Sequence, residues 1–359
     1  ARHPEGDGPI VIASAFEEDI AWNLKQAGLT DVCAFRDSSR HILCEGIYGL
    51  LPEGERFTLL DVGARDAVND ERWLGIPASR MRLYGFELDD EGCEAMNREM
   101  AESGIEARFF PYGLAGAAGR RSFHHSTRHP GSSSLYPYNM ELFGRIKMAD
   151  SHEAHNLAQF LEPIESLEVQ VSTLDQWKAR HDVASVDFMK LNVQGAELEI
   201  LQGGESLLPE VLGLFTEAAF VESYVGRPLF ADLDRYLRSQ GFTFFTFIGP
   251  MCMGRNASPV TTRHLPSFHA WHGQLIEAHA LYLRDPIAAE SRGQDMRLYT
   301  KANILKLAAL AERHCQTEFA FEVLAWAEQK AVTEGDHDFA AALRALIDGA
   351  ARSYQERFK

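Results

Sequence analysis

Apolar runs alternate with helical patterns through the middle of the chain. Cys93, Met96 and Met100, for example, follow helical spacing and stop before Gly104. Alternation of this kind predicts an α/β fold with a parallel sheet. No helix is predicted between the last two strands, so we expect an antiparallel hairpin at the sheet edge. The predicted strands cover 57–62, 81–87, 107–110, 186–192, 211–217, 242–248 and 274–283.

The two ends of the chain depart from this series. Residues 9–14 and 32–35 predict strands, and a capping box of Ser14 and Glu17 predicts a helix between them. This βαβ fragment is too short to be a domain and suggests a piece of a longer, multidomain protein. From about residue 298 the pattern is helical and rich in alanine, which predicts two or three helices that pack on the domain or join copies into a homo-oligomer. We therefore divide the chain into an N-terminal α/β extension (1–56), a central domain (57–285) and a C-terminal helical segment (286–359).

Residues from about 115 to 170 interrupt the alternation. They include His124, His125 and His129, followed by Pro130 and a run of glycine and serine. This composition is typical of a loop or lid. Long irregular insertions in compact domains are usually functional or disordered, so we expect a lid beside the site.

Composition and charge limit the classes of partner and ligand that we expect for this protein. The formal charge is −17, which disfavours nucleic acid and anionic membrane as partners. The five cysteines are scattered without a CxxC pair, so we expect neither disulfides nor a zinc cluster, and a reducing, cytoplasmic location. His269 and His272 have the spacing of a metal pair but no third ligand nearby, so we expect no metal site. No apolar run reaches the length of a membrane span.

Polar and glycine residues end the first two strands of the central series. Asp61 and Gly63 close the first strand, and Glu87 lies 26 residues further on, at the end of the second. At that spacing, a carboxylate accepts hydrogen bonds from ribose hydroxyls in nucleotide-binding folds. The glycine-rich loop that a pyrophosphate needs is absent, because Arg65 and Ala67 follow Gly63. S-adenosylmethionine has no phosphate, so the pattern favours this cofactor over NAD or FAD.

A second polar segment ends the strand at 186–192. Lys190 either pairs with a carboxylate or points outward, and Asn192 and Gln194 form hydrogen bonds but cannot act as bases near neutral pH. In a doubly wound sheet, substrate meets cofactor beyond this edge. The candidates for a general base are His124 or His125 of the insertion and Glu217. Glu217 and Glu222 could equally bind sugar hydroxyls.

Several motifs together resemble the FkbM family of S-adenosylmethionine-dependent methyltransferases. The resemblance covers roughly residues 57–285, and the last motif is the most specific. The family usually has Asp where this chain has Asn192, Glu where it has Gln194, and often Asn where it has Arg65. The motifs are Asp61-Val-Gly-Ala, Gly85-Phe-Glu-Leu-Asp89, Ser133-Ser134-Leu135, Ser172-Thr-Leu-Asp175 and Lys190-Leu-Asn-Val-Gln-Gly-Ala-Glu.

The resemblance implies a class I methyltransferase fold, with a Rossmann-like seven-stranded sheet and helices on both faces. The irregular segment at about 115–170 is then a long insertion between the third and fourth strands. It implies O-methylation of a hydroxyl in a glycan, sugar or secondary metabolite. The acceptor is then a small molecule or glycan, with a role in glycan biosynthesis. We assign catalysis to His124, His125, Lys190 and Glu217, cofactor binding to Asp61, Gly63, Arg65, Glu87, Leu88, Gly113, Leu114 and Asn192, and substrate binding to Ser133, Ser134, Gln194 and Glu222.

Two other readings stay open. The departure at Asn192 and the fragment-like N-terminus suit a cofactor-binding but catalytically silent module of a larger glycan-assembly protein. A nicotinamide-dependent oxidoreductase is the third reading, which the missing glycine-rich loop disfavours.

Overall fold

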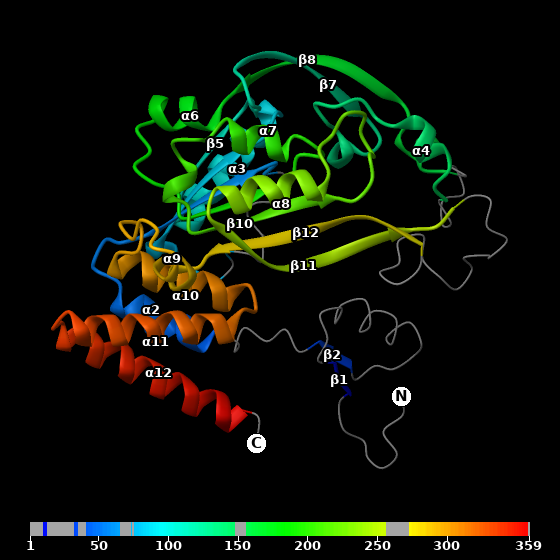
Figure 1. The fold of residues 1–359 in the computed structure, drawn as a ribbon. Coiled ribbons are helices and arrows are strands. Elements are labelled where there is room, and N and C mark those ends of the chain that lie inside the picture. Colours follow the sequence, from blue (N-terminus) through cyan, green and yellow to red (C-terminus); the bar gives the residue numbers. More distant parts are fainter. Residues whose placement is uncertain are drawn as a thin grey trace.

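A seven-stranded, mostly parallel sheet forms the centre of the molecule (Figure 1). The computed structural model describes residues 10–12, 32–34, 41–64, 73, 75–147, 156–255 and 273–357. The strand order is β11-β12-β10-β9-β3-β4-β5, with β12 antiparallel to both of its neighbours. The Rossmann-like sheet and its edge hairpin are therefore confirmed. The strands are β3 (Phe57–Val62), β4 (Met81–Phe86), β5 (Glu106–Phe110), β9 (Phe188–Leu191), β10 (Gly213–Ala219), β11 (Phe242–Met253) and β12 (Gln274–Arg284).

The sheet is buried between two layers of helices. All six residues of β3 are buried, as expected of a parallel strand covered on both faces. Phe57 and Leu59 belong to the core on one face, and Leu60 and Val62 to the core on the other. The first face packs against α2 (Ile42–Leu50), α3 (Asp90–Ser103) and α10 (Lys301–Arg313), and the second against α6 (Leu174–Arg180), α7 (Glu197–Gln202) and α8 (Phe230–Ser239).

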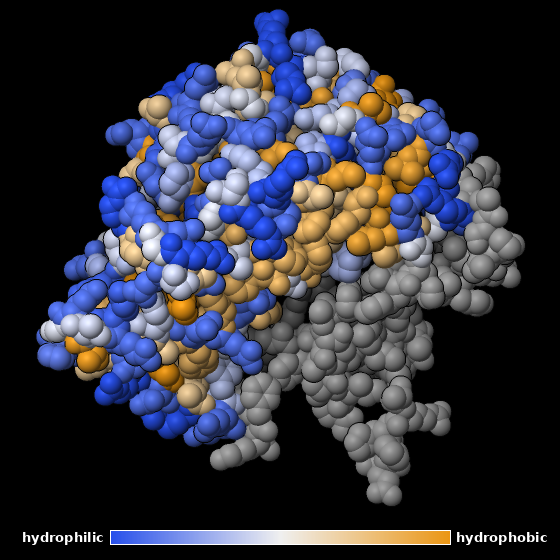
Figure 2. Space-filling view, viewed as in Figure 1, coloured by the Kyte–Doolittle hydropathy of each residue, from blue (hydrophilic) through white to orange (hydrophobic). Residues whose placement is uncertain are grey.

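The edge hairpin is longer than the pattern predicts. Strand β11 continues to Met253, so the predicted end of this strand at residue 248 is wrong. Pairing with β12 extends the strand through several register shifts, which supply backbone partners that the sequence does not reveal. Apolar residues gather along this part of the surface (Figure 2), where Phe244, Phe245 and Phe247 are half-buried.

The insertion between β5 and β9 contains regular structure rather than loop alone. Three strands, β6 (Gly113–Leu114), β7 (Gly119–Ser126) and β8 (Ile164–Ser172), form a separate sheet, with β8 in the middle. The prediction of irregular structure is therefore wrong for the segment that carries His124 and His125, which lies in β7. Two short helices, α4 (Met140–Gly144) and α5 (Leu157–Leu161), also belong to the insertion and share a small core with β11 and β12.

The N-terminal strands pair as predicted. Strands β1 (Ile10–Ile12) and β2 (Val32–Ala34) are parallel and form a sheet of their own. The helix expected between them lies outside the described residues. Helix α2, in contrast, is not predicted, because Gly46 and Gly49 weaken its helical signal.

The C-terminal segment folds into helices, as the alanine-rich pattern predicts. These are α9 (Pro286–Ser291), α10, α11 (Thr317–Thr333) and α12 (His337–Arg357). Helix α10 is almost wholly buried and shares one core with α2, α3 and the sheet. Within the part of the chain that the structure describes, no helix combines the length and apolar character needed to cross a membrane.

Candidate active site

The carboxyl ends of β3 and β9 are joined by a buried ion pair. Asp61 and Lys190 are direct partners in the parallel register, and their Oδ1 and Nζ atoms lie 2.7 Å apart. The ammonium group also donates to the carbonyl oxygen of Gly63 at 2.8 Å. Asp61 is fully buried, and Lys190 nearly so. Of the two alternatives for Lys190, the structure therefore selects pairing with a carboxylate, and this pair fixes the loop that follows β3.

Gly63 has a steric reason to be glycine. Its φ is +85°, a region that disfavours other residues, and a Cβ at this position would lie 2.2 Å from the carbonyl oxygen of Asn192. The backbone that approaches Gly63 is therefore the loop after β9. The backbone N–H of Asn192 in turn donates to Val62 at 3.0 Å, so the two loops are held together.

Glu87 lies at the end of β4 with its carboxylate held in place. Its Oε1 accepts hydrogen bonds from the backbone N–H groups of Leu88 at 2.8 Å and Asp89 at 3.3 Å. The Leu88 side chain lies beside Gly113, where a Cβ would be 3.5 Å from its Cδ2, and the next residue, Leu114, is buried. The structure therefore brings four predicted cofactor residues together at one edge. Arg65 lies outside the described residues.

Gln194 is the centre of a hydrogen-bond network. Its φ is +57°, unusual for a residue with a side chain. Its Nε2 donates to Asn192 Oδ1 at 3.0 Å and to Glu217 Oε2 at 2.6 Å, and its Oε1 accepts from the Tyr224 hydroxyl at 2.8 Å. The Ser134 hydroxyl donates to its backbone oxygen at 2.6 Å. The surroundings therefore hold a strained backbone in place, which is common at functional sites.

Glu217 is a buried carboxylate with both oxygens engaged. Oε1 accepts from Arg227 Nη2 at 2.6 Å, and Oε2 accepts from Gln194. Burial lowers the pKa of Arg227, but Glu217 and the neighbouring Glu197 outweigh burial and raise it overall. Glu217 is thus positioned at the end of β10 by one cation and one amide.

Two further carboxylates face the same guanidinium group. Glu197 Oε2 lies 4.0 Å from Arg227 Nη2, and Glu277 Oε2 lies 3.8 Å from Arg227 Nη1. Glu197 also accepts from the backbone N–H groups of Val193 at 3.0 Å and Gly195 at 2.9 Å. Burial and then the charge of Glu217 raise the pKa of Glu197 to about 7. The three carboxylates and Arg227 are called the carboxyl cluster below.

The predicted histidines contact hydroxyl groups of the insertion. His124 Nδ1 lies 3.3 Å from Ser166 Oγ, and His125 Nδ1 lies 3.1 Å from Ser133 Oγ. As consecutive residues of β7, the two imidazoles point to opposite faces of its sheet. The structure therefore links His125 to the predicted substrate residue Ser133, and from there along the chain to Ser134 and the Gln194 network.

Glu222 is exposed beside the cluster. Its Oε1 accepts from the backbone N–H of Gly226 at 2.7 Å, directly before Arg227. It thus supports the turn that carries Arg227.

Sequence reasoning did not assign Arg227, Tyr224 or Glu277 to the site. Arg227 belongs to the stretch Tyr224-Val-Gly-Arg-Pro-Leu-Phe-Ala-Asp232, which resembles a subgroup of the FkbM family and is therefore a usable signal. Glu277 and His279 alternate with the buried residues Ile276, Ala278 and Ala280, so the pattern places them on the opposite face of the strand from those residues.

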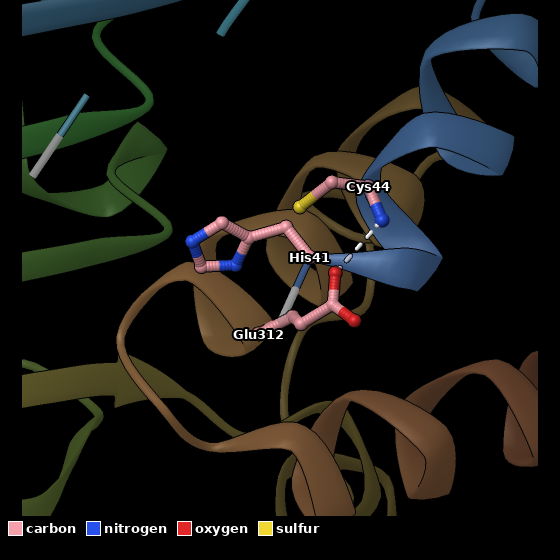
Figure 3. Close-up of side chains that lie close together, drawn as sticks. All are labelled: His41, Cys44 and Glu312. Atoms are coloured by element: carbon pink, nitrogen blue, oxygen red, sulfur yellow. Dashed lines mark hydrogen bonds between the residues drawn. The ribbon is translucent and has the colours of Figure 1, made fainter. Parts of the chain in front are cut away.

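One group of metal-ligating residue types comes together in the described residues, away from this edge (Figure 3). It comprises His41, Cys44 and Glu312, whose ligand atoms lie within 4.8 Å of one another. Both carboxylate oxygens of Glu312 are engaged at the start of α2, where they accept from the N–H groups of Leu43 at 2.9 Å and Cys44 at 2.8 Å. Burial, reinforced by Glu312, raises the pKa of Cys44. These contacts identify a helix cap that ties α10 to α2. His269 and His272 lie outside the described residues.

Comparison with known proteins identifies the class. A family model, the Methyltransferase FkbM domain, matches residues 61–244, just over half of the 359 residues. The chain therefore belongs to the FkbM family of methyltransferases, as the motifs imply. It is also 28% identical over 178 residues to the 2-O-methyltransferase NoeI of Sinorhizobium fredii, a match that covers 49% of this chain and 69% of that protein.

Solved structures give weaker similarity. A precorrin-6y C5,15-methyltransferase from Geobacter metallireducens has a TM-score of 0.31 at 9% identity, over 68% of this chain and 88% of its own. A SAM-dependent methyltransferase from Aquifex aeolicus has a TM-score of 0.24 at 12% identity, over 72% and 97%. The family assignment does not rest on either.

Proposed function

We propose that this protein is an S-adenosylmethionine-dependent O-methyltransferase that acts on a hydroxyl of a sugar, in a glycan or a secondary metabolite. The observation that carries the proposal is the arrangement at the carboxyl edge of the sheet. The fixed carboxylate of Glu87, the paired loops at Gly63 and Asn192, and the carboxyl cluster lie at the ends of adjacent strands. Ligands of doubly wound sheets bind at this edge.

The residues at the edge suit this cofactor. The Glu87 carboxylate, oriented by two backbone N–H groups, is suited to accept hydrogen bonds from ribose hydroxyls, and Leu88 and Leu114 offer apolar contact beside it. The backbones of Gly63 and Asn192 approach each other at this edge, and Gly113 lies beside Leu88. Asp61 acts through Lys190, whose ammonium group fixes the Gly63 carbonyl.

The bound cofactor would supply an electrophilic methyl group on a sulfonium cation. The protein then has to orient the acceptor hydroxyl and remove its proton, and positioning supplies much of the rate in such reactions. Ser133, Ser134, Gln194 and Glu222 are the proposed acceptor-side residues. Their contacts support this role indirectly, because Ser134 and Gln194 bond to each other and together shape the loop after β9.

The relative NoeI supports transfer to oxygen, because it is named as a 2-O-methyltransferase. The net charge of −17 favours a neutral or cationic acceptor over an anionic one. A sugar hydroxyl meets both conditions.

Cofactor binding is the first test. Calorimetric titration of S-adenosylmethionine and S-adenosylhomocysteine should show binding of both ligands to the intact protein. Glu87→Gln should weaken both by roughly tenfold, the loss of one charge-assisted hydrogen bond. The exposed Glu94→Gln on the following helix serves as the matched control and should leave both affinities unchanged. Binding of NAD instead would favour an oxidoreductase.

Acceptor specificity is the second test. The protein is incubated with S-adenosylmethionine and a panel of methyl glycosides, and mass spectrometry detects the addition of one methyl group. We expect transfer to at least one glycoside and no transfer to its analogue that lacks the methylated hydroxyl. Cofactor binding without transfer to any sugar, in glycans as well as simple glycosides, would favour the catalytically silent module.

A further inference from the structure

The carboxyl cluster carries more negative charge than its cation can balance. Glu197, Glu217 and Glu277 all lie within 4.0 Å of the Arg227 guanidinium, whose side chain is 1% exposed. Three ionised carboxylates around one guanidinium leave two uncompensated charges. A buried site of this kind takes up a proton rather than hold that excess.

Glu217 and Glu277 are neighbours on one face of the sheet. In the antiparallel pair β10 and β12, Ala219 is opposite Glu277, and Glu217 is opposite His279. Opposed residues share a face, and so do residues two apart, which places the two glutamates diagonally. Carboxylates at such close range cannot both ionise freely.

The three carboxylates differ in their hydrogen-bond partners and in their exposure to solvent. Glu197 caps two backbone N–H groups, and Glu217 is held by Arg227 and Gln194. The side chain of Glu217 is 2% exposed, whereas that of Glu277 is 20% exposed. Glu277 is therefore the cluster member that can exchange a proton with solvent or with a bound acceptor.

The surroundings of Glu277 favour its protonated form. Burial and then the charge of Glu217 raise its pKa well above the ordinary value, against the opposing effect of Arg227. The other ionisable groups around it are Glu197 and the Tyr224 hydroxyl, whose own pKa is raised by burial and by Glu217. On the same strand as Glu277, His279 lies two residues away and stacks on Phe215. On the neighbouring strand β11, the partner of Glu277 is Met251.

We propose that Glu277 is the group that exchanges a proton during the reaction: it holds a proton against Glu217 in the unliganded protein, releases it to solvent when the sulfonium cation binds, and then accepts the proton of the attacking hydroxyl. This inference rests on the proposed function. A chain of hydrogen bonds connects the cluster to the cofactor edge, from Glu217 through Gln194 to Asn192, which packs on Gly63.

The proposed steps balance in atoms and charge. On cofactor binding, the Glu277 O–H bond breaks, the proton leaves to buffer, and the charge of the new carboxylate offsets that of the added cation. In transfer, the acceptor oxygen forms a bond to the methyl carbon while the sulfur keeps the electron pair of the broken C–S bond. The hydroxyl proton passes to the Glu277 carboxylate, which restores the starting state.

Proton release on binding tests the proposal without an acceptor. S-Adenosylmethionine is a sulfonium cation, and S-adenosylhomocysteine lacks that charge. Calorimetry near pH 7 in buffers of different ionisation enthalpy should show about one more proton released with the first ligand than with the second. Glu277→Gln should abolish the difference, whereas the exposed Glu141→Gln on α4 should keep it. Equal release for both ligands, or a difference that persists in Glu277→Gln, overturns the proposal.

A second measurement separates this proposal from the proposed function. Infrared spectra of the unliganded protein near pH 7 should contain the C=O band of a protonated carboxyl group that Glu277→Gln removes and Glu277→Asp retains. If Glu277→Gln leaves the spectrum unchanged, no such proton exists and the inference fails, whatever the cofactor does. If the band is present but neither ligand binds, the proposed function fails while the proton held by Glu277 stands.

Discussion

Both ends of strand β9 carry buried ionisable residues, but the ratio of carboxylates to cations differs between the two ends. Before the strand, Asp187 Oδ2 accepts from Lys306 Nζ of α10 at 2.9 Å and from the backbone N–H of Thr58 at 2.7 Å. Glu55 Oε1 lies 2.6 Å from the same ammonium group and is 34% exposed. After the strand, the carboxyl cluster sets three carboxylates against Arg227.

The difference separates an end with a structural role from the end at which we propose the functional site. At the amino end, a single fully buried carboxylate meets a lysine, and the second carboxylate retains contact with water. At the carboxyl end, excess negative charge coincides with a left-handed Gln194 and a glycine pressed against Asn192. Uncompensated buried charge and strained backbone both cost stability, and proteins retain them mainly at functional sites.

The largest expected effect lies at the amino end. Lys306→Met leaves Asp187 buried without its cation, which should reduce the free energy of unfolding by about 3–5 kcal/mol. Denaturant unfolding measures this loss. As a control, Lys301→Ala removes the exposed ion pair with Asp336 from the same helix and should reduce stability far less than Lys306→Met. A similar small loss of stability in both variants would show that the ion pair between Lys306 and Asp187 contributes little to the stability of the fold.

Gly63→Ala should affect stability and cofactor affinity together. The new Cβ would displace the carbonyl of Asn192, and we expect a loss of about 2–4 kcal/mol in stability from strain and steric conflict. Gly104→Ala is the matched control, because Gly104 has a similar φ of +74° but nothing within 4 Å of its Cβ position. It should cost about 1 kcal/mol and leave S-adenosylmethionine affinity unchanged. Equal losses in both variants would mean that the loop contact contributes nothing beyond the backbone angle.

The smallest expected effect is also pH-dependent. Gln194→Glu replaces the donor to Glu217 with a carboxylate, which should cost about 1–3 kcal/mol near pH 7. Repulsion raises the pKa of the new group in the folded state, so the folded protein binds more protons than the unfolded one. The deficit should therefore shrink as pH falls through that raised pKa. Thermal unfolding from pH 5 to 8 measures it, and a pH-independent loss would contradict the electrostatic explanation.

The same sign applies to Glu197 in the unchanged protein. Its pKa rises from 4.5 to about 7 on folding, so its contribution to stability falls as pH rises through this range. Thermal unfolding of Glu197→Gln and of the unchanged protein measures the pH dependence of stability that Glu197 itself contributes. The pH dependence of Gln194→Glu is then compared with this contribution.

Much of the central domain could be predicted from the pattern of residues. Uninterrupted apolar runs that end in polar residues and glycine identified the parallel strands, and the two adjacent runs at the end identified the hairpin. The motifs at Asp61, Glu87 and Lys190 placed the candidate site at the carboxyl edge. These signals are local, because a strand covered on both faces is recognisable from a few consecutive residues.

The parts that were missed depend on distant partners. Helix α2 contains two glycines, and contacts with Leu346 of α12 and Glu312 of α10 accompany its formation. Strand β7 has a mixed composition but pairs with β8 along its whole length. Lys306 looks like an ordinary helical lysine until α10 brings it to Asp187, 119 residues away in the sequence.

The sequence by itself determined the fold class and the family, and it predicted the edge of the sheet at which the candidate site lies, because periodicity and short motifs are local features of neighbouring residues. The tertiary structure alone decided which charged groups meet. It paired Lys190 with Asp61, placed Arg227 among three carboxylates, and brought Glu277 from the last strand beside Glu217. The physical reason is that burial and Coulomb interaction depend on separation in space, and most of the residues that interact here come from strands and loops far apart in the chain.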